Sequence, residues 1–579
     1  MPKDSEQVLT WKIAGIAGGG QQVAGLIFAK ACARGGLYTF DSSEYPSLIR
    51  GEFVTYRLSI STSPVSAIYQ PNQLLIALTK EAYEYCLSDV VPGGAILYDS
   101  DKFKVEAKNV RGRKVFPLPL KTLSESAGVK PIAANILAIG ATTALLKYDP
   151  DIVKRTLQEV FSAKGQEVVA MNLKAFDFGY HYAQKEFDPA AFPFTLTPAK
   201  KRGSQILVTA NDTVALGAVA AGCQFFVAYP MTPSSSILHN MMNWADETGM
   251  LVFQPEDEIA GIHMAIGGMF AGVRTMTATS GGGFALMNEA LSLTAVTENP
   301  LVLVESQRPG PATGLPTWTE QGDLAYVSRA GHGEFPRVIL APGDASEAFP
   351  LTGLAFNLAE KYQIPVILLL DKYISEAHES IAPITQKFTV DRGARLTDAQ
   401  LTKIKEYKRY LHTTSGISPR AVPGQLNGIF LANSDEHDER GYTIEGFQGP
   451  ERVRQVDKRF RKVSRIHAEL PKPMLIGPKK AALTFIGWGS TKGPMLEALK
   501  ELKNVNYLHV SAPWPISEKV MKTAVSGARK LVAIENNATG QFAELLRGAT
   551  GIKVDDVFLK YDGAHFFPHE IIAKAKKLG

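Results

Sequence analysis

The stretch that decides the fold is residues 274–305, which read RTMTATSGGGFALMNEALSLTAVTENPLVLVE. It begins with a short strand-like run, passes through three glycines, continues with helical apolar spacing and ends in a second apolar run. Two parallel strands need a crossover connection between them, usually a helix. We therefore expect strands at 274–279 and 301–305, with a helix at 284–295 between them.

The same alternation extends in both directions from this stretch. Around it we expect helices at 212–221 and 258–271 and strands at 224–229, 338–341 and 364–370. Near the start, we expect a helix at 23–34, another at 133–146, and strands at 11–16, 53–61, 73–78, 95–98 and 168–172. A further α/β unit begins near Ala481. The fold class is therefore α/β, with several parallel-sheet domains covered by helices on both faces.

Composition places the domain boundaries. We expect an α/β domain at 1–185 and a linker at 186–203, which contains three prolines and a basic cluster. A second α/β domain then spans 204–394. Residues 395–470 are charged and rich in turn formers, so we interpret them as a connecting arm before a last α/β domain at 471–579.

Charge and cysteine content exclude several classes of protein. The net charge of +5 is small for 579 residues and no basic run is interleaved with aromatics, so nucleic-acid binding is not expected. No apolar run approaches the ~18 residues of a membrane helix, and the polar start is not expected to be a signal peptide. Cys32, Cys86 and Cys223 form no CxxC pair, which argues against a zinc or iron–sulfur site in this chain. We expect inert thiols in a reducing cytoplasm.

A glycine turn follows the first expected strand, at Gly15, Gly18, Gly19 and Gly20. Its spacing does not fit the GxGxxG pattern of dinucleotide-binding folds. The turn therefore serves either the approach of a phosphate group or only the packing of strand against helix, and the sequence leaves both open.

Four motifs lie just after expected strands or at a helix start. They are Tyr229–Ser235 (YPMTPSS), Glu256–Glu258 (EDE), Thr277–Phe284 (TATSGGGF) and Gln307–Gly314 (QRPGPATG). The carboxyl ends of parallel strands form the usual ligand-binding edge of such a sheet. We therefore expect one binding site built from these four segments.

With these motifs in this order, the chain resembles the alpha subunit of 2-oxoacid:ferredoxin oxidoreductases. Residues 1–185 resemble the family's gamma subunit, with the glycine turn, Tyr45–Gly51 and Asn135 in place, and the last domain is similar to its transketolase-C-like domain. The resemblance implies a fused gamma–alpha subunit of a thiamine diphosphate enzyme. The implied reaction converts a 2-oxoacid, coenzyme A and oxidised ferredoxin into acyl-CoA, CO₂ and reduced ferredoxin.

The resemblance also assigns roles to single residues. Glu258 matches the carboxylate that protonates the cofactor's aminopyrimidine ring, whereas Glu256 and Asp257 fit a solvated helix start better. Thr232 and Arg308 match the substrate-binding positions, although a local turn and a surface ion pair are the structural alternatives. By the same resemblance, Tyr229, Pro230 and Ser280 contact the cofactor, and Asp438 belongs to a loop that closes over the site, beside the alternative of a solvated turn.

Other parts of such a site are missing from this chain. Thiamine enzymes bind Mg-diphosphate through Gly-Asp-Gly followed by Asn-Asn, and neither Gly322-Asp323-Leu324 nor Gly343-Asp344-Ala345 fits that pattern. The resemblance therefore implies that no metal binds this chain. The diphosphate, Mg²⁺ and the [4Fe-4S] cluster lie on a separate beta subunit, within an (alpha–beta)₂ complex that passes electrons to ferredoxin.

2-Oxoglutarate is the expected substrate because of the fused gamma–alpha layout, with pyruvate or a branched-chain 2-oxoacid as the second choice. Two further alternatives stay open. The chain is either part of a non-redox thiamine enzyme, such as a 2-oxoacid decarboxylase or transketolase relative, or a nucleotide-binding assembly subunit without catalytic activity.

Overall fold

The computed structural model describes residues 8–47, 53–106, 110, 112–188, 190–199 and 205–579. Part of the Tyr45–Gly51 motif and the basic end of the expected linker, 200–203, lie outside the described residues. The chain forms two compact units. The first comprises residues 1–208 with the short segments 376–384 and 567–572, and the second comprises 209–375, 385–566 and 573–579.

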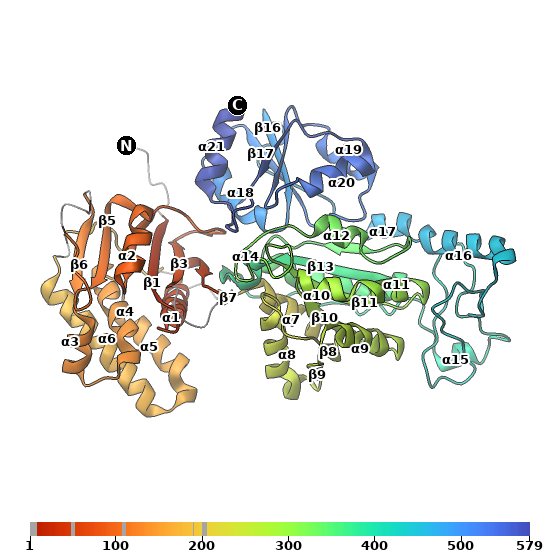
Figure 1. Cartoon of the computed structure of the whole chain (residues 1–579), viewed down its shortest axis with the longest axis horizontal. Helices are drawn as coiled ribbons and strands as arrows, with labels where there is room; N and C mark the ends of the chain where they lie inside the picture. Colours follow the sequence, from red (N-terminus) through yellow and green to blue (C-terminus); the bar gives the residue numbers. More distant parts are fainter. Residues whose placement is uncertain (1–7, 48–52, 107–109, 111, 189, 200–204) are drawn as a thin grey trace. The chain divides into compact units, whose positions relative to one another are not determined.

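The first unit is built on an eight-stranded mixed sheet (Figure 1). Its strand order is β6-β5-β4-β1-β3-β2-β14-β7, in which β1, β4, β5 and β6 pair in parallel and the remaining pairs are antiparallel. The strands are β1 (Leu9–Ile16), β2 (Tyr38–Glu44), β3 (Phe53–Ser61), β4 (Asn72–Ala77), β5 (Val90–Asp99), β6 (Lys114–Leu118), β7 (Ile206–Val208) and β14 (Glu379–Ile381).

Alternate residues of these strands enter two different cores. Trp11 and Ile13 pack with the larger group of helices, whereas Ala14 packs with a helix at residues 80–86 on the other face, as the period of two in a strand requires. Figure 1 shows α3, α4, α5 and α6 grouped together beside the strands. The helices are α1 (Gln21–Arg34), α2 (Lys80–Cys86), α3 (Leu120–Ala127), α4 (Ala134–Leu145), α5 (Pro150–Phe161) and α6 (Gln166–Glu186).

The prediction of a strand at 168–172 is wrong, because these residues lie inside α6. The buried residues of α6 recur at helical spacing. Two glycines let α6 approach α4 closely. A Cβ atom at Gly179 would lie 2.0 Å from the carbonyl oxygen of Leu137, and one at Gly140 would lie 2.2 Å from that of Phe176. The close contact between α4 and α6 therefore determines that residues 168–172 are helical, although they contain two β-branched valines.

The glycine turn after β1 has a structural requirement for glycine. Gly18 and Gly20 adopt positive φ angles of 83° and 85°, which side chains rarely tolerate. The amide group of Asn135 donates a hydrogen bond to the carbonyl oxygen of Gly19 and holds the turn against α4.

The second unit contains the expected parallel sheet, with the strand order β12-β13-β11-β10-β8-β9. Every neighbouring pair is parallel, so the carboxyl ends of all six strands meet at one edge. The strands are β8 (Phe225–Val227), β9 (Leu251–Phe253), β10 (Thr275–Thr279), β11 (Leu301–Gln307), β12 (Val338–Leu340) and β13 (Pro365–Asp371).

Helices flank this sheet, and one of them starts earlier than expected. The three glycines at 281–283 form the first turn of a helix rather than a separate turn, and the helix expected at 284–295 is divided at Met287. The helices are α7 (Ala210–Ala220), α8 (Ser235–Thr248), α9 (Glu258–Phe270), α10 (Gly281–Leu286), α11 (Asn288–Val296), α12 (Leu324–Arg329), α13 (Ala345–Tyr362) and α14 (Lys372–Glu376).

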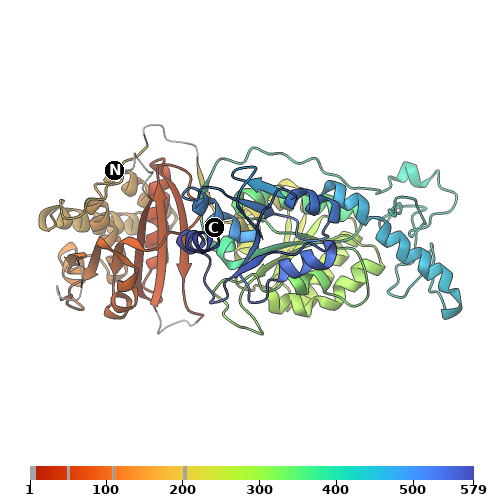
Figure 2. The same cartoon turned by 90° about the horizontal axis from the view of Figure 1, so that it is seen from above.

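The last segment of the chain forms a five-stranded sheet of order β15-β17-β16-β18-β19, drawn in blue in Figure 2. Only β15 is antiparallel to its neighbour. The two sheets of the second unit share one hydrophobic core, since Trp488 and Ile486 cluster with Leu303 and Ile339. The elements are β15 (Met474–Ile476), β16 (Leu483–Trp488), β17 (Val505–Val510), β18 (Leu531–Glu535), β19 (Asp556–Leu559), α18 (Lys492–Leu499), α19 (Glu518–Val525), α20 (Gln541–Thr550) and α21 (Pro568–Leu578).

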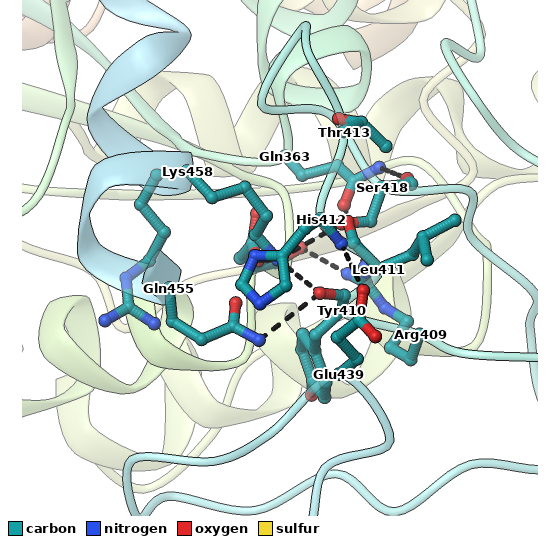
Figure 3. Close-up of polar contacts among 12 residues, drawn as sticks. Gln363, Arg409, Tyr410, Leu411, His412, Thr413, Ser418, Glu439, Gln455 and Lys458 are labelled. Atoms are coloured by element: carbon teal, nitrogen blue, oxygen red, sulfur yellow. Dashed lines mark hydrogen bonds and ion pairs between the residues drawn. The ribbon is translucent and has the colours of Figure 1, made fainter. Parts of the chain in front are cut away.

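Residues 395–470 contain little regular structure before α16 (Gly449–Arg461) and α17 (Val463–Glu469), with α15 (Asp398–Leu401) near their start. A buried polar network anchors them (Figure 3). Lys458 binds the carboxylate of Glu298 at 2.6 Å and the carbonyl oxygen of Tyr410 at 2.9 Å. Arg409 donates to the carbonyl oxygen of Glu298 at 2.7 Å. Burial opposes ionisation of Glu298, but the charges of Lys458, Lys462 and Arg409 outweigh it and hold its pKa well below the usual range.

Within the described residues, no single helix is long and apolar enough to cross a membrane. One pair of helices, Leu120–Ala127 with Pro131–Leu145, meets the requirement in length and composition only when taken together, across a bend of 119°. Cys32, Cys86 and Cys223 are all buried free thiols, and burial raises the pKa of each.

Candidate active site

Glu258 is the first residue of α9, and its position follows from how that helix is capped. Asp257 is the N-cap, and its carboxylate accepts a hydrogen bond from the backbone N–H of Ala260 at 2.8 Å. Glu256 is exposed, whereas Glu258 is only 3% exposed. Of three consecutive acidic residues, one therefore faces solvent, one caps the helix and one is directed into the protein.

The carboxylate of Glu258 lacks a complete set of hydrogen-bond partners. Its Oε1 atom is buried and makes no hydrogen bond with any described residue. Burial raises the pKa of Glu258, and the nearby charge of Asp257 raises it further, although a backbone hydrogen bond opposes the shift. A buried carboxyl group with an unused oxygen is costly for folding alone, so it marks this place as a candidate ligand site.

The glycines of α10 leave room for this carboxylate. A Cβ atom at Gly283 would lie 2.5 Å from Glu258 Oε1 and 2.1 Å from Thr279 Oγ1. At Gly282 a Cβ atom would meet nothing within 4 Å. Gly283 is thus required for space beside Glu258. Ser280, just before α10, is completely buried and its hydroxyl group has no partner among the described residues.

Thr232 and Arg308 meet across the edge of the sheet. Arg308 follows β11, and its Nη1 atom donates a hydrogen bond of 2.8 Å to the backbone carbonyl oxygen of Thr232. Asn211 supports the same loop by donating to the carbonyl oxygen of Pro233 at 2.8 Å. Arg308 Nε is buried and has no partner among the described residues. Burial lowers the pKa of Arg308, while Asp323 and Glu305 oppose that shift.

The remaining predicted residues divide into two groups. Tyr229 and Pro230 lie just beyond the end of β8 and are half-buried at the same sheet edge as Ser280. The hydroxyl group of Thr279 lies 3.9 Å from the sulfur of Met231, which connects the end of β10 with the Thr232 loop. The structure therefore brings the segments of Tyr229–Thr232, Glu258, Ser280 and Arg308 to one edge of one sheet.

Asp438 lies elsewhere in the second unit. Its carboxylate accepts hydrogen bonds from the backbone N–H groups of Arg440 and Tyr442, at 2.8 and 3.0 Å. The adjacent His437 is buried against the carbonyl oxygen of Val296, the last residue of α11. Within the described part of the chain, Asp438 forms no hydrogen bond or ion pair with Glu258, Thr232 or Arg308. A role for this residue in a closing loop stays a prediction.

The sequence interpretation missed two acidic residues beside Arg308. Glu305 lies on β11 and is completely buried, and Asp323 is the N-cap residue of α12. Their carboxyl groups lie within hydrogen-bonding reach of each other. The available signal was a glutamate that directly follows four apolar residues of the expected strand, because a glutamate is rarely fully buried unless it has a partner.

The features around Glu258 fit the aminopyrimidine ring that the sequence led us to expect. A ring nitrogen can be bound in its protonated form by a carboxylate with an unused oxygen, and Glu258 Oε1 is such an atom. Gly283 leaves space beside it, and the unpartnered hydroxyl group of Ser280 is available for a hydrogen bond to a ligand at the same edge. The chemistry of these groups therefore suits the pyrimidine half of a thiamine cofactor.

Comparison with known proteins gives matches over most of the chain. Residues 216–457 match the family "Pyruvate flavodoxin/ferredoxin oxidoreductase, thiamine diP-bdg", and residues 10–182 match "Pyruvate ferredoxin/flavodoxin oxidoreductase". The alpha subunit of 2-oxoacid:ferredoxin oxidoreductase 2 from Aeropyrum pernix is 32% identical, over 98% of this chain and 97% of that protein. The 2-oxoglutarate synthase subunit KorA from Methanothermobacter thermautotrophicus is also 32% identical, over 65% of this chain and 99% of that protein.

A solved structure agrees with these matches. The 2-oxoglutarate:ferredoxin oxidoreductase from Magnetococcus marinus, with 2-oxoglutarate, coenzyme A and succinyl-CoA bound, superimposes with a TM-score of 0.91. It is 32% identical in sequence, and the match covers 99% of this chain and 100% of that one. The chain therefore belongs to the family of 2-oxoacid:ferredoxin oxidoreductase alpha subunits.

Proposed function

We propose that this chain contributes the carboxyl group that binds the pyrimidine ring in a thiamine diphosphate site shared with another subunit. The complete enzyme oxidatively decarboxylates 2-oxoglutarate, with coenzyme A, to succinyl-CoA and CO₂ and reduces ferredoxin. One observation carries the proposal. Glu258 is a buried carboxyl group with an unused oxygen, held beside a glycine that keeps space open next to it.

In this proposal Glu258 holds a proton between its carboxylate and the pyrimidine ring nitrogen. When bound, the cofactor supplies the carbon nucleophile that attacks the 2-oxo carbonyl group. Burial raises the pKa of Glu258, which makes this carboxyl group a better proton acceptor than an exposed glutamate. Tyr229, Pro230 and Ser280 line the same edge of the sheet and are assigned to contacts with the cofactor.

Arg308 and Thr232 are assigned to the carboxylate of the substrate. The hydrogen bond from Arg308 Nη1 to the Thr232 carbonyl fixes the guanidinium group in place, and Nε remains unused within the described residues. A guanidinium group held in one orientation binds a carboxylate with little further loss of side-chain entropy. Asp438 is retained as a weaker candidate on the arm.

The choice of 2-oxoglutarate draws on relatives. One relative is named 2-oxoglutarate synthase, and a solved relative contains 2-oxoglutarate, coenzyme A and succinyl-CoA. We propose coenzyme A as co-substrate here for the same reason. Pyruvate and branched-chain 2-oxoacids remain the competing substrates in the experiment below.

We further propose a beta subunit that holds the diphosphate group, Mg²⁺ and a [4Fe-4S] cluster, in an (alpha–beta)₂ complex that reduces ferredoxin. Supporting this, the three cysteines are buried and dispersed, and burial raises the pKa of each thiol, which disfavours the thiolate that iron binding needs. Relatives are also named as alpha subunits, which implies partner chains.

The test is a substrate panel on the complex that co-purifies with this chain. We expect CoA-dependent reduction of ferredoxin or a viologen, fastest with 2-oxoglutarate, together with bound iron and thiamine. Faster turnover of pyruvate would change the substrate, and an iron-free complex that releases only CO₂ would indicate a non-redox decarboxylase. No turnover of any 2-oxoacid would contradict the proposal.

Two glutamates two residues apart provide a matched pair of variants. Glu258→Gln removes the buried carboxylate, so turnover by the complex should fall at least ~100-fold. Glu256→Gln changes an exposed glutamate on the same segment and should stay within about twofold of the unmodified complex. Equal rates for both variants would favour an assembly role for the chain.

A further inference from the structure

Two further carboxyl groups, those of Glu305 and Asp323, lie beside Arg308. Glu305 is completely buried on β11, and neither of its side-chain oxygens accepts a hydrogen bond from an N–H or O–H donor among the described residues. Its neighbour is the carboxyl group of Asp323, at hydrogen-bonding reach. Two carboxylates repel each other and neither can donate, so this contact is stable only when one proton lies between them.

Asp323 is fixed on both sides. Its backbone N–H donates to Gln307 Oε1 at 3.0 Å, and the Gln307 amide donates to the carbonyl oxygen of Leu370 at 2.9 Å. On its other side, a Cβ atom at Gly281 would lie 2.7 Å from Asp323 Oδ2. The pair therefore lies between α10, which borders Glu258, and β11, which Arg308 directly follows. The position of these carboxyl groups is set by the backbone of the site.

The charges around the pair favour one retained proton. Burial raises the pKa of Glu305, with Asp323 and Asp371 adding to the shift and Arg308 opposing it. Burial also raises the pKa of Asp323 to about 6 and that of Asp371 to about 6. The charged and titratable groups that face the pair are Arg308 just after β11, Asp371 on β13, Glu320 before α12 and Tyr326 on α12.

We propose that Glu305 and Asp323 share one proton and thereby keep the guanidinium group of Arg308 available for the carboxylate of the substrate. With one proton, the pair carries a single negative charge that balances Arg308. Without it, the pair carries two negative charges, which would hold the guanidinium group and repel an incoming carboxylate. Glu305 and Asp323 are thus positioning residues that act through Arg308. The inference rests on the substrate-binding role of Arg308 in the proposed function.

The kinetic test measures KM and kcat for the 2-oxoacid from pH 6 to 9 on the complex that co-purifies with this chain, beside Glu305→Gln and Asp323→Asn. In the unmodified complex, KM should rise at least ~10-fold toward alkaline pH with little change in kcat, since ten-fold corresponds to about 1.4 kcal/mol of lost binding. Either variant should abolish that rise, because it removes the second negative charge. Glu320→Gln, which lies outside the pair, should keep it.

A second measurement does not need turnover. Infrared spectra of the same full-length proteins at pH 7.5 should show a protonated carboxylic acid C=O band that loses one component in Glu305→Gln and is unchanged in Glu320→Gln. The proposal is overturned if the infrared band is the same in Glu305→Gln, or if the alkaline rise in KM survives in both pair variants. If no 2-oxoacid is turned over at all, the proposed function fails, while the infrared result still decides whether the pair holds a proton.

Discussion

At the scale of single residues, Glu258 lowers the stability of the fold but provides the carboxyl group that the proposed function needs. Burying a carboxyl group without a full set of partners costs stability, and the structure accepts this cost at a helix start where Asp257 already provides the cap. Such unfavourable groups concentrate at sites that bind a ligand, because the ligand supplies the missing partner.

Replacement of Glu258 should therefore have opposite effects on the stability of the cofactor-free chain and on cofactor binding. In the chain without thiamine, Glu258→Gln should raise the melting temperature by a few degrees, since a neutral amide is easier to bury than a carboxylate. The same variant should bind thiamine diphosphate more weakly in the complex. Differential scanning fluorimetry with and without the cofactor measures both effects, and a lower melting temperature of the cofactor-free variant would contradict the explanation.

Gly283 gives a second prediction at this scale. In Gly283→Ala the new methyl group would meet Glu258 Oε1 and Thr279 Oγ1, so the carboxylate must move away from its position. Turnover by the complex should fall at least ~10-fold, because a displaced acid no longer reaches the cofactor. Gly282→Ala adds the same methyl group in open space one residue earlier and should be close to unmodified in both activity and stability. Similar losses in both variants would show that helix geometry, rather than space beside Glu258, is responsible.

At the scale of elements, the α4–α6 contact in the first unit shows how packing overrides local sequence. Residues 168–172 include a Val-Val pair that favours a strand, yet they belong to a helix whose glycine meets the backbone of α4. A glycine in a helix costs about 1 kcal/mol in propensity relative to alanine, and here that cost permits close approach of two helices.

Gly179→Ala should therefore destabilise the chain, although alanine is the better helix former. Its Cβ atom would lie 2.0 Å from the carbonyl oxygen of Leu137, a backbone atom that cannot rotate away, so we expect a loss of about 1–3 kcal/mol in chemical denaturation. Gly267→Ala lies on α9 with nothing within 4 Å of the new atom and should be neutral or stabilising by up to ~1 kcal/mol. A stabilised Gly179→Ala variant would contradict the close helix crossing.

At the scale of the molecule, ionic contacts within the second unit join the last α/β segment of the chain to α13. Glu347 on α13 accepts from Lys492 Nζ at 2.6 Å and lies 2.9 Å from His509 Nε2, and these two partners come from α18 and β17. Burial alone would raise the pKa of Glu347, but the hydrogen bonds and charges of His509 and Lys492 outweigh it and hold the pKa at about 2.

The lowered pKa fixes the sign of a pH effect. Glu347 stabilises the folded state above its unfolded-state pKa of about 4.5, and this contribution is lost as the pH falls toward about 2. Glu347→Gln should lower stability at pH 7 and flatten the decline of stability between pH 4.5 and 2. The exposed Glu544→Gln should leave both unchanged. Urea denaturation across this range measures the slopes, and parallel curves for all three proteins would contradict the role of Glu347.

The amino-acid sequence by itself determined the alternation of strands and helices in the second unit, the place of the four motifs at one sheet edge, and Glu258 as the acid to examine. The first two features follow from local periods and from the rule that parallel strands end together, so neighbouring residues are enough to predict them, whereas Glu258 was singled out by the resemblance of its motif to the family. The departures in the first unit have the opposite cause, since antiparallel pairing in its sheet and the helix at 168–172 depend on partners far along the chain.

The chemistry of the site was decided only by the tertiary structure. The space beside Glu258 depends on a glycine 25 residues away, the hydrogen bond of Arg308 reaches back 76 residues to Thr232, and the Glu305–Asp323 contact joins a strand to a helix cap. A residue's charge and available hydrogen bonds depend on which groups exclude water around it. That environment is created by contacts between distant segments, so it exists only once the chain has folded.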